Sequence, residues 1–345
     1  MTAFRVGISP DVLDTRGTPI FDPSAFDLLK APGVEWNYLT AAEEKTISPD
    51  TAAAYDAVCL MLGRVKQETF ARGPGRLKLV ARFGVGFDTI DVPACAEHGV
   101  LLTIAPDGVR RPVAVNVITF ILVLAQRLAE KDRLTREGRW PEKANYMGMG
   151  VTGRTLGAIG MGNIGAEVFR LAPPFGMRHI AYDPYVAPEA ARALGVELVD
   201  LDTLLRTADF VCVMCPLNEE TRGLIGAREL ALMKPTAYLV NTARGPIVRE
   251  SALYEALEAR KIAGAALDVF EVEPTPSDNP ILKLDNVVVT PHAFCFTDEC
   301  LTGLARSAFT SVVDVASGRA PRYIVNRKAL SHPRLSALHP REEDA

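Results

Sequence analysis

The sequence lacks any apolar run long enough to cross a membrane. Its longest apolar block, Val113–Ala125, contains Asn116 and Thr119 and is far shorter than the roughly 20 residues of a membrane-spanning helix. Met1–Leu13 also lacks a basic segment followed by a sustained apolar run, so no secretory signal is expected. These absences predict a cytoplasmic protein that does not enter a membrane, with Val113–Ala125 as a buried helix.

The sequence is also poor in cysteine and has no excess of positive charge. Six cysteines among 345 residues, without a disulfide-like spacing, predict reduced thiols. A formal net charge of −4 argues against binding to nucleic acids or membrane surfaces, which are themselves negative. The length exceeds what one hydrophobic core usually holds, and with 48% apolar residues it predicts two domains.

A glycine-rich segment, Gly157–Gly165, follows a short apolar run and precedes a helix-like one. In the pattern G-x-G-x-x-G, Gly160 allows a tight turn, Gly162 lets the backbone approach a pyrophosphate, and Gly165 lets the helix pack close to its strand. The N-terminus of that helix favours phosphate. The motif alone would also fit an ordinary turn, but its strand–helix–strand context favours a dinucleotide site that includes Asn163 and Ile164.

Asp183 ends the second predicted strand of this unit, about 20 residues after the turn. A carboxylate at this place binds the ribose 2′-hydroxyl and would repel a 2′-phosphate. The sequence therefore predicts NAD, rather than NADP, as the cofactor.

Short apolar runs separated by helix-length segments occur along the chain and predict two parallel α/β domains. The predicted strands begin near residues 4, 34, 58, 79 and 100 in the first series and near 155, 178, 196, 210, 237, 263 and 287 in the second. The remaining segments are predicted as a linker at Pro106–Pro112, helices at Val113–Leu134 and Asp298–Ser317, a short strand at Tyr323–Asn326 and a loose tail at Ser331–Ala345.

A second glycine-rich loop, Gly84–Asp91, lies at the carboxyl end of the predicted strand Leu79–Phe83. Amide groups around Val85 and Gly86 could receive an anion, or the loop could be a simple turn that needs positive φ at its glycines. Arg64 follows another strand and could reach the same place, or it could be a solvated surface charge. The spacing leaves these alternatives open.

Three ionisable residues follow strands of the second series: Arg244, Glu273 and His292. The carboxyl ends of parallel strands share one edge of the sheet, so these side chains are expected to converge beside a bound dinucleotide. Each residue alone also has an ordinary explanation as a turn or solvated loop residue. Glu271 competes with Glu273, because residues two apart in an extended segment face the same way.

The chain resembles the D-isomer-specific 2-hydroxyacid dehydrogenase family, in particular its glyoxylate/hydroxypyruvate reductase-like members. The resemblance covers nearly the whole chain. It rests on Gly84–Asp91, Thr155–Gly165, Tyr182-Asp183-Pro184, Asn241–Gly245, Leu267–Phe270 with Glu273-Pro274, Thr290-Pro291-His292 and Val325-Asn326.

The resemblance implies an NAD-dependent oxidoreductase that interconverts a small 2-keto acid and its D-2-hydroxy acid. It implies that Arg244 binds the substrate, that His292 is the general acid/base and that Glu273 is its partner. Val85 and Gly86 would offer their amides to the substrate carboxylate, and Arg64 remains a further substrate-binding candidate. Pro216, Thr221, Thr242 and Asp268 would contact the cofactor.

The implied fold is a Rossmann NAD-binding domain, residues 108–297, inserted in a flavodoxin-like substrate domain. The substrate domain would comprise residues 1–107 and 298–330, followed by a loose tail at 331–345. The resemblance also implies a homodimer that pairs through the NAD-binding domains, with Trp140 near the subunit contact; the plainer reading of Trp140 is an exposed aromatic residue.

Two departures from the family pattern concern the substrate. Phe294-Cys295 stand where small residues usually follow the histidine, and Val115-Asn116 replace the usual continuation of the bridging helix. No metal is expected, because His292, Cys295 and Cys300 lack a fourth ligand at a matching spacing. Cys212 and Cys215 should point to opposite faces of a strand. Alternatives on the same fold are an NADH-sensing, corepressor-like binding protein and a formate or phosphite dehydrogenase.

Overall fold

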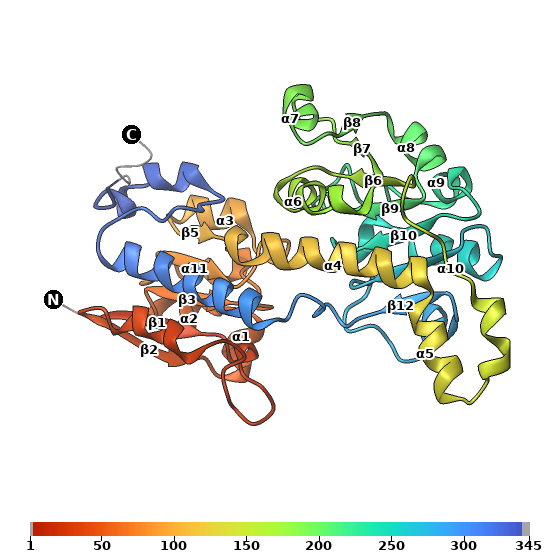
Figure 1. Cartoon of the computed structure of the whole chain (residues 1–345). Coiled ribbons are helices and arrows are strands. Elements are labelled where there is room, and N and C mark those ends of the chain that lie inside the picture. Colours follow the sequence, from red (N-terminus) through yellow and green to blue (C-terminus); the bar gives the residue numbers. More distant parts are fainter. Residues whose placement is uncertain (1–2, 340–345) are drawn as a thin grey trace. The chain divides into compact units, whose positions relative to one another are not determined.

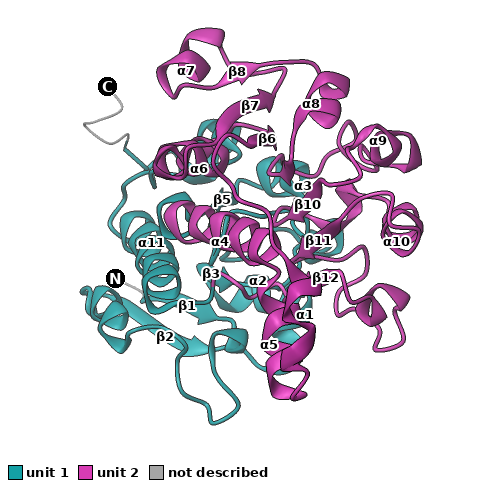
Figure 2. Ribbon diagram, turned by 45° about the vertical axis from the view of Figure 1, so that its right-hand side comes forward, with its two compact units in different colours: residues 1–109, 296–345 teal, residues 110–295 magenta. Residues whose placement is uncertain are grey.

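The computed structural model describes residues 3–339 and is shown in Figure 1. The chain divides into two compact units, coloured separately in Figure 2. Unit 1 consists of Met1–Val109 and Phe296–Ala345, and unit 2 of Arg110–Cys295. The first boundary follows residue 109 rather than the expected 107, and the second follows 295 rather than 297.

Unit 1 contains a five-stranded parallel sheet in the order β2-β1-β3-β4-β5, which is the flavodoxin-like order predicted from the sequence. Its strands are β1 (Phe4–Ile8), β2 (Val34–Tyr38), β3 (Ala57–Leu60), β4 (Leu79–Arg82) and β5 (Leu101–Thr103). β3 and β4 are buried at every residue, which explains the wholly apolar sequence of β3 and the apolar sequence of β4 as far as Arg82.

Helices cover both faces of this sheet. The helices are α1 (Ala41–Lys45), α2 (Pro49–Ala54), α3 (Val92–Glu97) and α11 (Asp298–Ala316), with the 3₁₀ segments η2 (Pro23–Lys30) and η3 (Gln67–Phe70). Val58, Val80 and Leu102 form one core cluster with Ala52 of α2 and Ala94 of α3. α11 contacts β3 and β4, and its N-cap is Thr297, whose hydroxyl accepts a hydrogen bond from the Cys300 amide.

Unit 2 contains a seven-stranded parallel sheet in the order β12-β11-β10-β9-β6-β7-β8. The six strands from β8 to β11 follow the Rossmann order, and β12 extends it, so the predicted doubly wound sheet is confirmed. The strands are β6 (Thr155–Ile159), β7 (Arg178–Tyr182), β8 (Glu197–Leu198), β9 (Phe210–Val213), β10 (Tyr238–Asn241), β11 (Gly264–Leu267) and β12 (Val287–Val289).

Alternate residues of these strands enter two core clusters, one on each face of the sheet. The helices are α4 (Pro106–Gln126), α5 (Leu128–Arg136), α6 (Asn163–Leu171), α7 (Pro188–Ala193), α8 (Leu201–Thr207), α9 (Ala227–Leu232) and α10 (Glu250–Glu258). Val211 packs with α8, α9 and α10, whereas Phe210 and Cys212 pack with α4, α6 and α7. Cys215 packs on the face opposite Cys212, as the strand spacing predicted.

The predicted linker at Pro106–Pro112 is wrong, because this segment forms the start of α4. Pro106 occupies the first helical position, where proline is tolerated. Pro112 lies inside the helix despite its missing amide. The helix predicted for Val113–Leu134 is divided at Arg127, whose φ of 51° ends α4 before α5 begins.

Within the described part of the chain, α4 alone has the length and hydropathy of a membrane-spanning helix, but 61% of its most apolar window is buried inside the protein. This burial is typical of a core helix in a soluble protein, and it agrees with the buried helix predicted around Val113–Ala125.

The tail expected to be loose is packed as far as His339. The 3₁₀ segments η8 (Arg327–Ser331) and η9 (Pro333–Leu335) precede a bridge between Arg319 and His339. The Arg334 guanidinium donates hydrogen bonds to backbone carbonyls of unit 1, including the His98 oxygen at 2.9 Å. Residues 340–345 lie outside the described residues. The strand expected at Tyr323–Asn326 is only a bridge between Thr103 and Ile324.

Candidate active site

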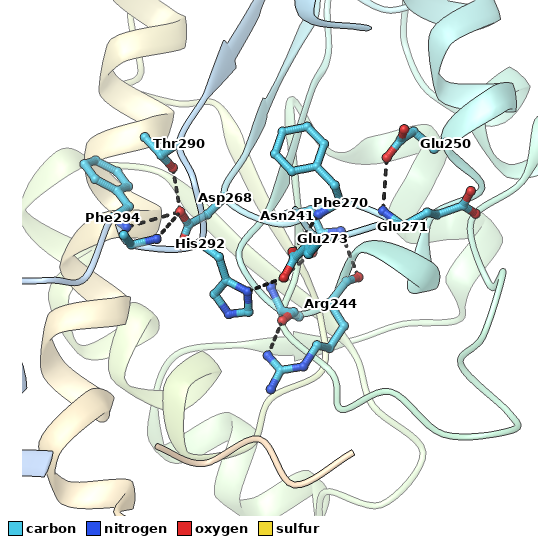
Figure 3. Close-up of polar contacts among 12 residues, drawn as sticks. Asn241, Arg244, Glu250, Asp268, Phe270, Glu271, Glu273, Thr290, His292 and Phe294 are labelled. Atoms are coloured by element: carbon cyan, nitrogen blue, oxygen red, sulfur yellow. Dashed lines mark hydrogen bonds and ion pairs between the residues drawn. The ribbon is translucent and has the colours of Figure 1, made fainter. Parts of the chain in front are cut away.

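Neighbouring strands carry the three candidate catalytic residues to one edge of the unit 2 sheet. β10, β11 and β12 are parallel neighbours, and Arg244, Glu273 and His292 follow their carboxyl ends. Figure 3 shows the three side chains close together below the strand ends. The structure therefore brings these predicted residues into one cluster.

His292 and Glu273 form the central contact of this cluster. The Nδ1 atom of His292 lies 2.7 Å from Oε2 of Glu273, and Oε1 of Glu273 accepts a hydrogen bond from the Phe270 amide at 2.9 Å. Glu271 points away from His292 (Figure 3), and its amide instead donates to Glu250. The geometry thus selects Glu273 over Glu271 as the histidine's partner.

The contact between the two side chains shifts both of their pKa values. The hydrogen bond that His292 donates to Glu273, together with the Glu273 charge, raises the pKa of His292 above the ordinary value, against the lowering effects of burial and of the Arg244 charge. Burial alone would raise the pKa of Glu273, but hydrogen bonds from His292 and Phe270, with the charges of His292 and Arg244, outweigh it and lower that pKa. The pair therefore favours imidazolium beside carboxylate.

Asp268 fixes the turn that carries His292. Its Oδ1 accepts hydrogen bonds from the Thr290 hydroxyl at 2.6 Å, the Ala293 amide at 3.1 Å and the Phe294 amide at 3.2 Å. His292 itself has a φ of 54°, a left-handed conformation that is uncommon for a residue with a side chain. Sequence reasoning assigned Asp268 only to the cofactor and missed this positioning role.

Arg244 lies in a turn that packs directly against the loop leading to Glu273. The Asn241 side chain donates to the Arg244 carbonyl at 3.1 Å and accepts from the Ala243 amide at 3.0 Å, which holds this turn. A Cβ atom on Gly245 would lie 1.9 Å from the backbone carbon and oxygen of Phe270. Only glycine therefore fits between the turn that bears Arg244 and the loop that leads to Glu273.

The unusual Phe294 packs into the core of unit 2. Its ring centroid lies 4.3 Å from that of Phe120 in α4, and both belong to the cluster on that face of the sheet. Figure 3 shows its ring turned away from His292. Its bulk is therefore accommodated beneath the histidine turn.

The glycine-rich turn has the close contacts that the motif predicts. A Cβ atom on Gly160, whose φ is 96°, would lie 2.6 Å from the Cys215 amide nitrogen, and one on Gly165 would lie 2.5 Å from the Gly160 carbonyl oxygen. A Cβ on Gly162 would have no neighbour within 4 Å. The fold itself therefore needs Gly160 and Gly165, whereas Gly162 leaves open space that suits the close approach of a phosphate.

This turn leads into α6, where Asn163 and Ile164 form the first turn and Gly162 is the N-cap. Among the described residues no side chain caps this helix, so its first amides remain available to an anion. Asp183 lies against the turn, since its Oδ2 accepts from the Met161 amide at 2.8 Å. These features fit the diphosphate and ribose of a dinucleotide.

Three further predicted cofactor residues lie in loops at the same carboxyl edge. The Thr221 hydroxyl donates to the Pro216 carbonyl at 2.7 Å and accepts from the Asn218 amide at 2.9 Å, which fixes the loop after β9. Thr242 is half-buried directly after β10. A contact of these residues with the cofactor remains a prediction.

The predicted substrate residues Val85, Gly86 and Arg64 belong to unit 1. Val85 and Gly86 are half-buried in the loop after β4, and Arg64 is exposed. Arg82, buried in β4, donates to the Gly86 carbonyl at 3.1 Å and supports this loop. Sequence reasoning missed Arg82, although a charge inside an apolar strand is a recognisable signal.

Among residues 3–339, no group of three or more His, Cys, Asp or Glu side chains is arranged to hold a metal ion. None of the described cysteines is joined in a disulfide.

Comparisons with known proteins agree with this geometry. Residues 118–293 match the model of the D-isomer specific 2-hydroxyacid dehydrogenase, NAD binding domain. The chain is 41% identical over 276 residues to a glyoxylate reductase from Korarchaeum cryptofilum, covering 79% of this chain and 83% of the relative. It is 38% identical over 302 residues to a D-3-phosphoglycerate dehydrogenase from Archaeoglobus fulgidus, covering 88% of this chain but only 57% of that longer relative.

A solved structure of D-lactate dehydrogenase from Aquifex aeolicus, complexed with NAD and lactic acid, superposes with a TM-score of 0.78 at 28% sequence identity. The superposition covers 91% of this chain and 96% of that one. Unit 2 is therefore an NAD-binding domain, and the protein belongs to the D-isomer specific 2-hydroxyacid dehydrogenase family.

Proposed function

We propose that the protein is an NAD-dependent oxidoreductase that interconverts a small 2-keto acid and its D-2-hydroxy acid. The observation that carries this proposal is the 2.7 Å contact between His292 and Glu273 at the carboxyl edge of an NAD-binding sheet. The names of the relatives, glyoxylate reductase and D-3-phosphoglycerate dehydrogenase, support a 2-hydroxy acid as the substrate class.

His292 supplies and removes the proton in this proposal. When bound, NADH supplies the hydride. As the substrate carbonyl becomes an alkoxide, the Nε2–H of the imidazolium donates a proton to its oxygen, and the neutral ring takes the proton back in the reverse direction. Glu273 binds Nδ1, which leaves Nε2 directed to the substrate and favours the charged ring.

Arg244 binds the substrate in this proposal. Its planar guanidinium can donate paired hydrogen bonds to the carboxylate and to the carbonyl oxygen, which orients and polarises the 2-keto acid. The amides of Val85 and Gly86, with Arg64, are the proposed further donors to the carboxylate. Pro216, Thr221, Thr242 and Asp268 are the proposed cofactor contacts.

A panel of 2-keto acids tests this function. Purified protein should oxidise NADH when given at least one of glyoxylate, hydroxypyruvate, pyruvate or a longer 2-keto acid, and NADPH should be a poorer donor because Asp183 would repel its 2′-phosphate. The measurement is the initial rate with each cofactor. Equal rates with both cofactors would contradict the role of Asp183, and formate or phosphite oxidation without 2-keto acid reduction would contradict the substrate class.

Replacing Glu273 with glutamine should move the pH profile of 2-keto acid reduction. Reduction needs the imidazolium, so activity is present below the pKa of His292 and is lost as the pH rises through it. Because Glu273 raises that pKa, its loss should shift the alkaline limb of the pH profile downward. The matched control is Glu271→Gln, whose profile should remain that of the wild type. Equal profiles for all three proteins would remove Glu273 from this role.

We also propose that the protein forms a homodimer through unit 2. Large apolar side chains are exposed along one stretch of the chain: Leu128 of α5 is 54% exposed, Trp140 of η4 (Trp140–Tyr146) is 62% exposed, and Met147, directly after η4, is 82% exposed. A subunit contact would remove such side chains from water.

The expected result for the wild type is sedimentation as a dimer. Trp140→Glu combined with Met147→Glu should shift the population toward monomer, since charged groups would be buried at the contact. A monomeric wild type, or a dimer that the double substitution leaves unchanged, would contradict this interface. The proposed setting is the cytoplasm, where cysteines that form no disulfide stay reduced.

A further inference from the structure

Unit 2 has a basic cavity at the edge of the sheet opposite the cofactor turn. The cavity is a depression that is largely open to solvent, with a volume of about 740 Å³. Thr155 and Arg178, which line it, are the first residues of β6 and β7, and Asp209 immediately precedes β9. The cavity therefore lies at the amino ends of the strands, whereas the glycine-rich turn and His292 lie at their carboxyl ends.

Positive charge dominates the lining of this cavity. Arg154, Arg178, Arg206 and Lys234 line it together with a single carboxylate, Asp209. No apolar side chain contributes to the lining. With four cations and one anion, the formal charge of the lining is 4 − 1 = +3, although the whole chain carries −4. This local excess would attract and concentrate anions.

The Asp209 carboxylate does not pair closely with all four cations. It is 4% exposed, and its Oδ2 accepts the Thr155 amide at 2.8 Å while its Oδ1 binds Lys234 Nζ at 3.1 Å. Arg154 approaches the same Oδ1 only to 3.9 Å. Asp209 is thus committed mainly to the backbone and to Lys234.

The other two guanidinium groups are also loosely paired. Arg178 lies 3.9 Å from Glu197, and Arg206 lies 3.6 Å from Asp202, which Arg228 binds more closely at 2.7 Å. Elsewhere in unit 2, Arg111 and Arg170 bind Glu167 at 3.0 Å each. The three arginines of the cavity keep donor capacity that planar oxyanions satisfy well.

We propose that this cavity is a second ligand site, which binds a small, multiply charged phosphate-type anion. The four cations come from separate segments: one lies before β6, one in β7, one in α8 and one before β10. Together they can contact several phosphoryl groups at once. A compact polyphosphate or a phosphorylated metabolite with two or more anionic groups fits this arrangement, and it would bind independently of the nucleotide at the opposite edge.

Calorimetric titration of inorganic triphosphate into NADH-saturated protein tests this site. Saturation with NADH keeps the probe out of the cofactor turn. The wild type should bind about one triphosphate per chain, with an affinity that falls as salt is added. Arg178→Gln combined with Arg206→Gln should weaken this binding about tenfold or more, because two charge-assisted contacts are lost. Both side chains are more than half exposed, at 66% and 58%, so folding should be unaffected.

The matched control is Arg136→Gln combined with Arg192→Gln. These exposed arginines lie in α5 and α7, outside the cavity, and their replacement changes the net charge equally. The control should bind triphosphate like the wild type. Absence of binding to the wild type, or equal weakening in both double variants, would overturn the proposal. The comparison measures binding, so its outcome is separate from whether 2-keto acids are reduced.

Discussion

Replacing His292 with alanine should lower the turnover of 2-keto acid reduction by about 10²- to 10⁴-fold, the range expected for loss of a general acid. The substituted protein has no group to protonate the developing alkoxide. The cofactor turn is built from other segments, Gly160–Gly165 and Asp183, so NADH should still bind with near wild-type affinity. Steady-state rates and NADH fluorescence titration measure the two quantities separately.

The exposed His339, far along the sequence in unit 1, provides a matched control. His339→Ala should leave turnover unchanged. If His292→Ala turns over at nearly the wild-type rate, another group transfers the proton and the assignment of His292 is wrong. If NADH binding is lost together with turnover, His292 is also needed for the cofactor site, and a role limited to proton transfer is wrong.

Replacing Gly245 with alanine should be damaging although it adds a single methyl group. That methyl would lie 1.9 Å from the Phe270 backbone, which cannot move away as a flexible side chain could. The turn that carries Arg244 and the loop that carries Glu273 must then separate. We expect the free energy of unfolding to fall by about 3 kcal/mol. We expect turnover to fall about 100-fold, because a shift of about 1 Å in a catalytic group has such a cost.

Gly162→Ala is the informative comparison, because the added methyl meets no atom within 4 Å in the protein itself. Its effect on unfolding should stay below about 1 kcal/mol, the usual size of an N-cap change. Its effect should instead fall on NADH affinity, since the methyl occupies the space proposed for the pyrophosphate. Denaturant unfolding without cofactor and NADH titration distinguish the two variants. A stable, fully active Gly245→Ala protein would contradict the packing described here.

The strands of both sheets were predictable because parallel strands buried on two faces have continuous apolar sequences. β3, β4, β6 and β9 are buried at every residue, so their sequences need no alternation. Their order in each sheet is that of the flavodoxin-like and Rossmann folds which the family resemblance implied.

The predictions of a linker and of a loose tail were wrong because tertiary packing overrides local sequence signals in both segments. Pro106, Gly108 and Pro112 are helix-breaking residues, yet they lie within α4, whose Gly108 packs against α11 at Gly303. The tail after Ser331 has no periodic apolar pattern. It is held by side-chain contacts such as that of Arg334 with the His98 carbonyl, which no local sequence feature reveals.

The residues of the candidate site were predictable from the sequence, whereas the contacts that hold them in place were less so. Strand ends and motif spacing indicated Arg244, Glu273 and His292, while the choice between Glu271 and Glu273 needed either the resemblance or the geometry. The His292 turn is anchored by the Asp268 carboxylate, which accepts from the Ala293 amide 25 residues away, and the Gly86 carbonyl is held by the Arg82 side chain. Such contacts follow from the fold and are not encoded in spacing.

Identification of the product tests the central claim most directly. The protein should be incubated with NADH and each 2-keto acid of the panel, and the hydroxy acid should be separated by chiral chromatography. The account predicts one D-2-hydroxy acid formed for each NADH consumed, with the yield abolished or severely reduced in the His292→Ala protein. No hydroxy acid from any 2-keto acid, or formation of the L enantiomer, would contradict it.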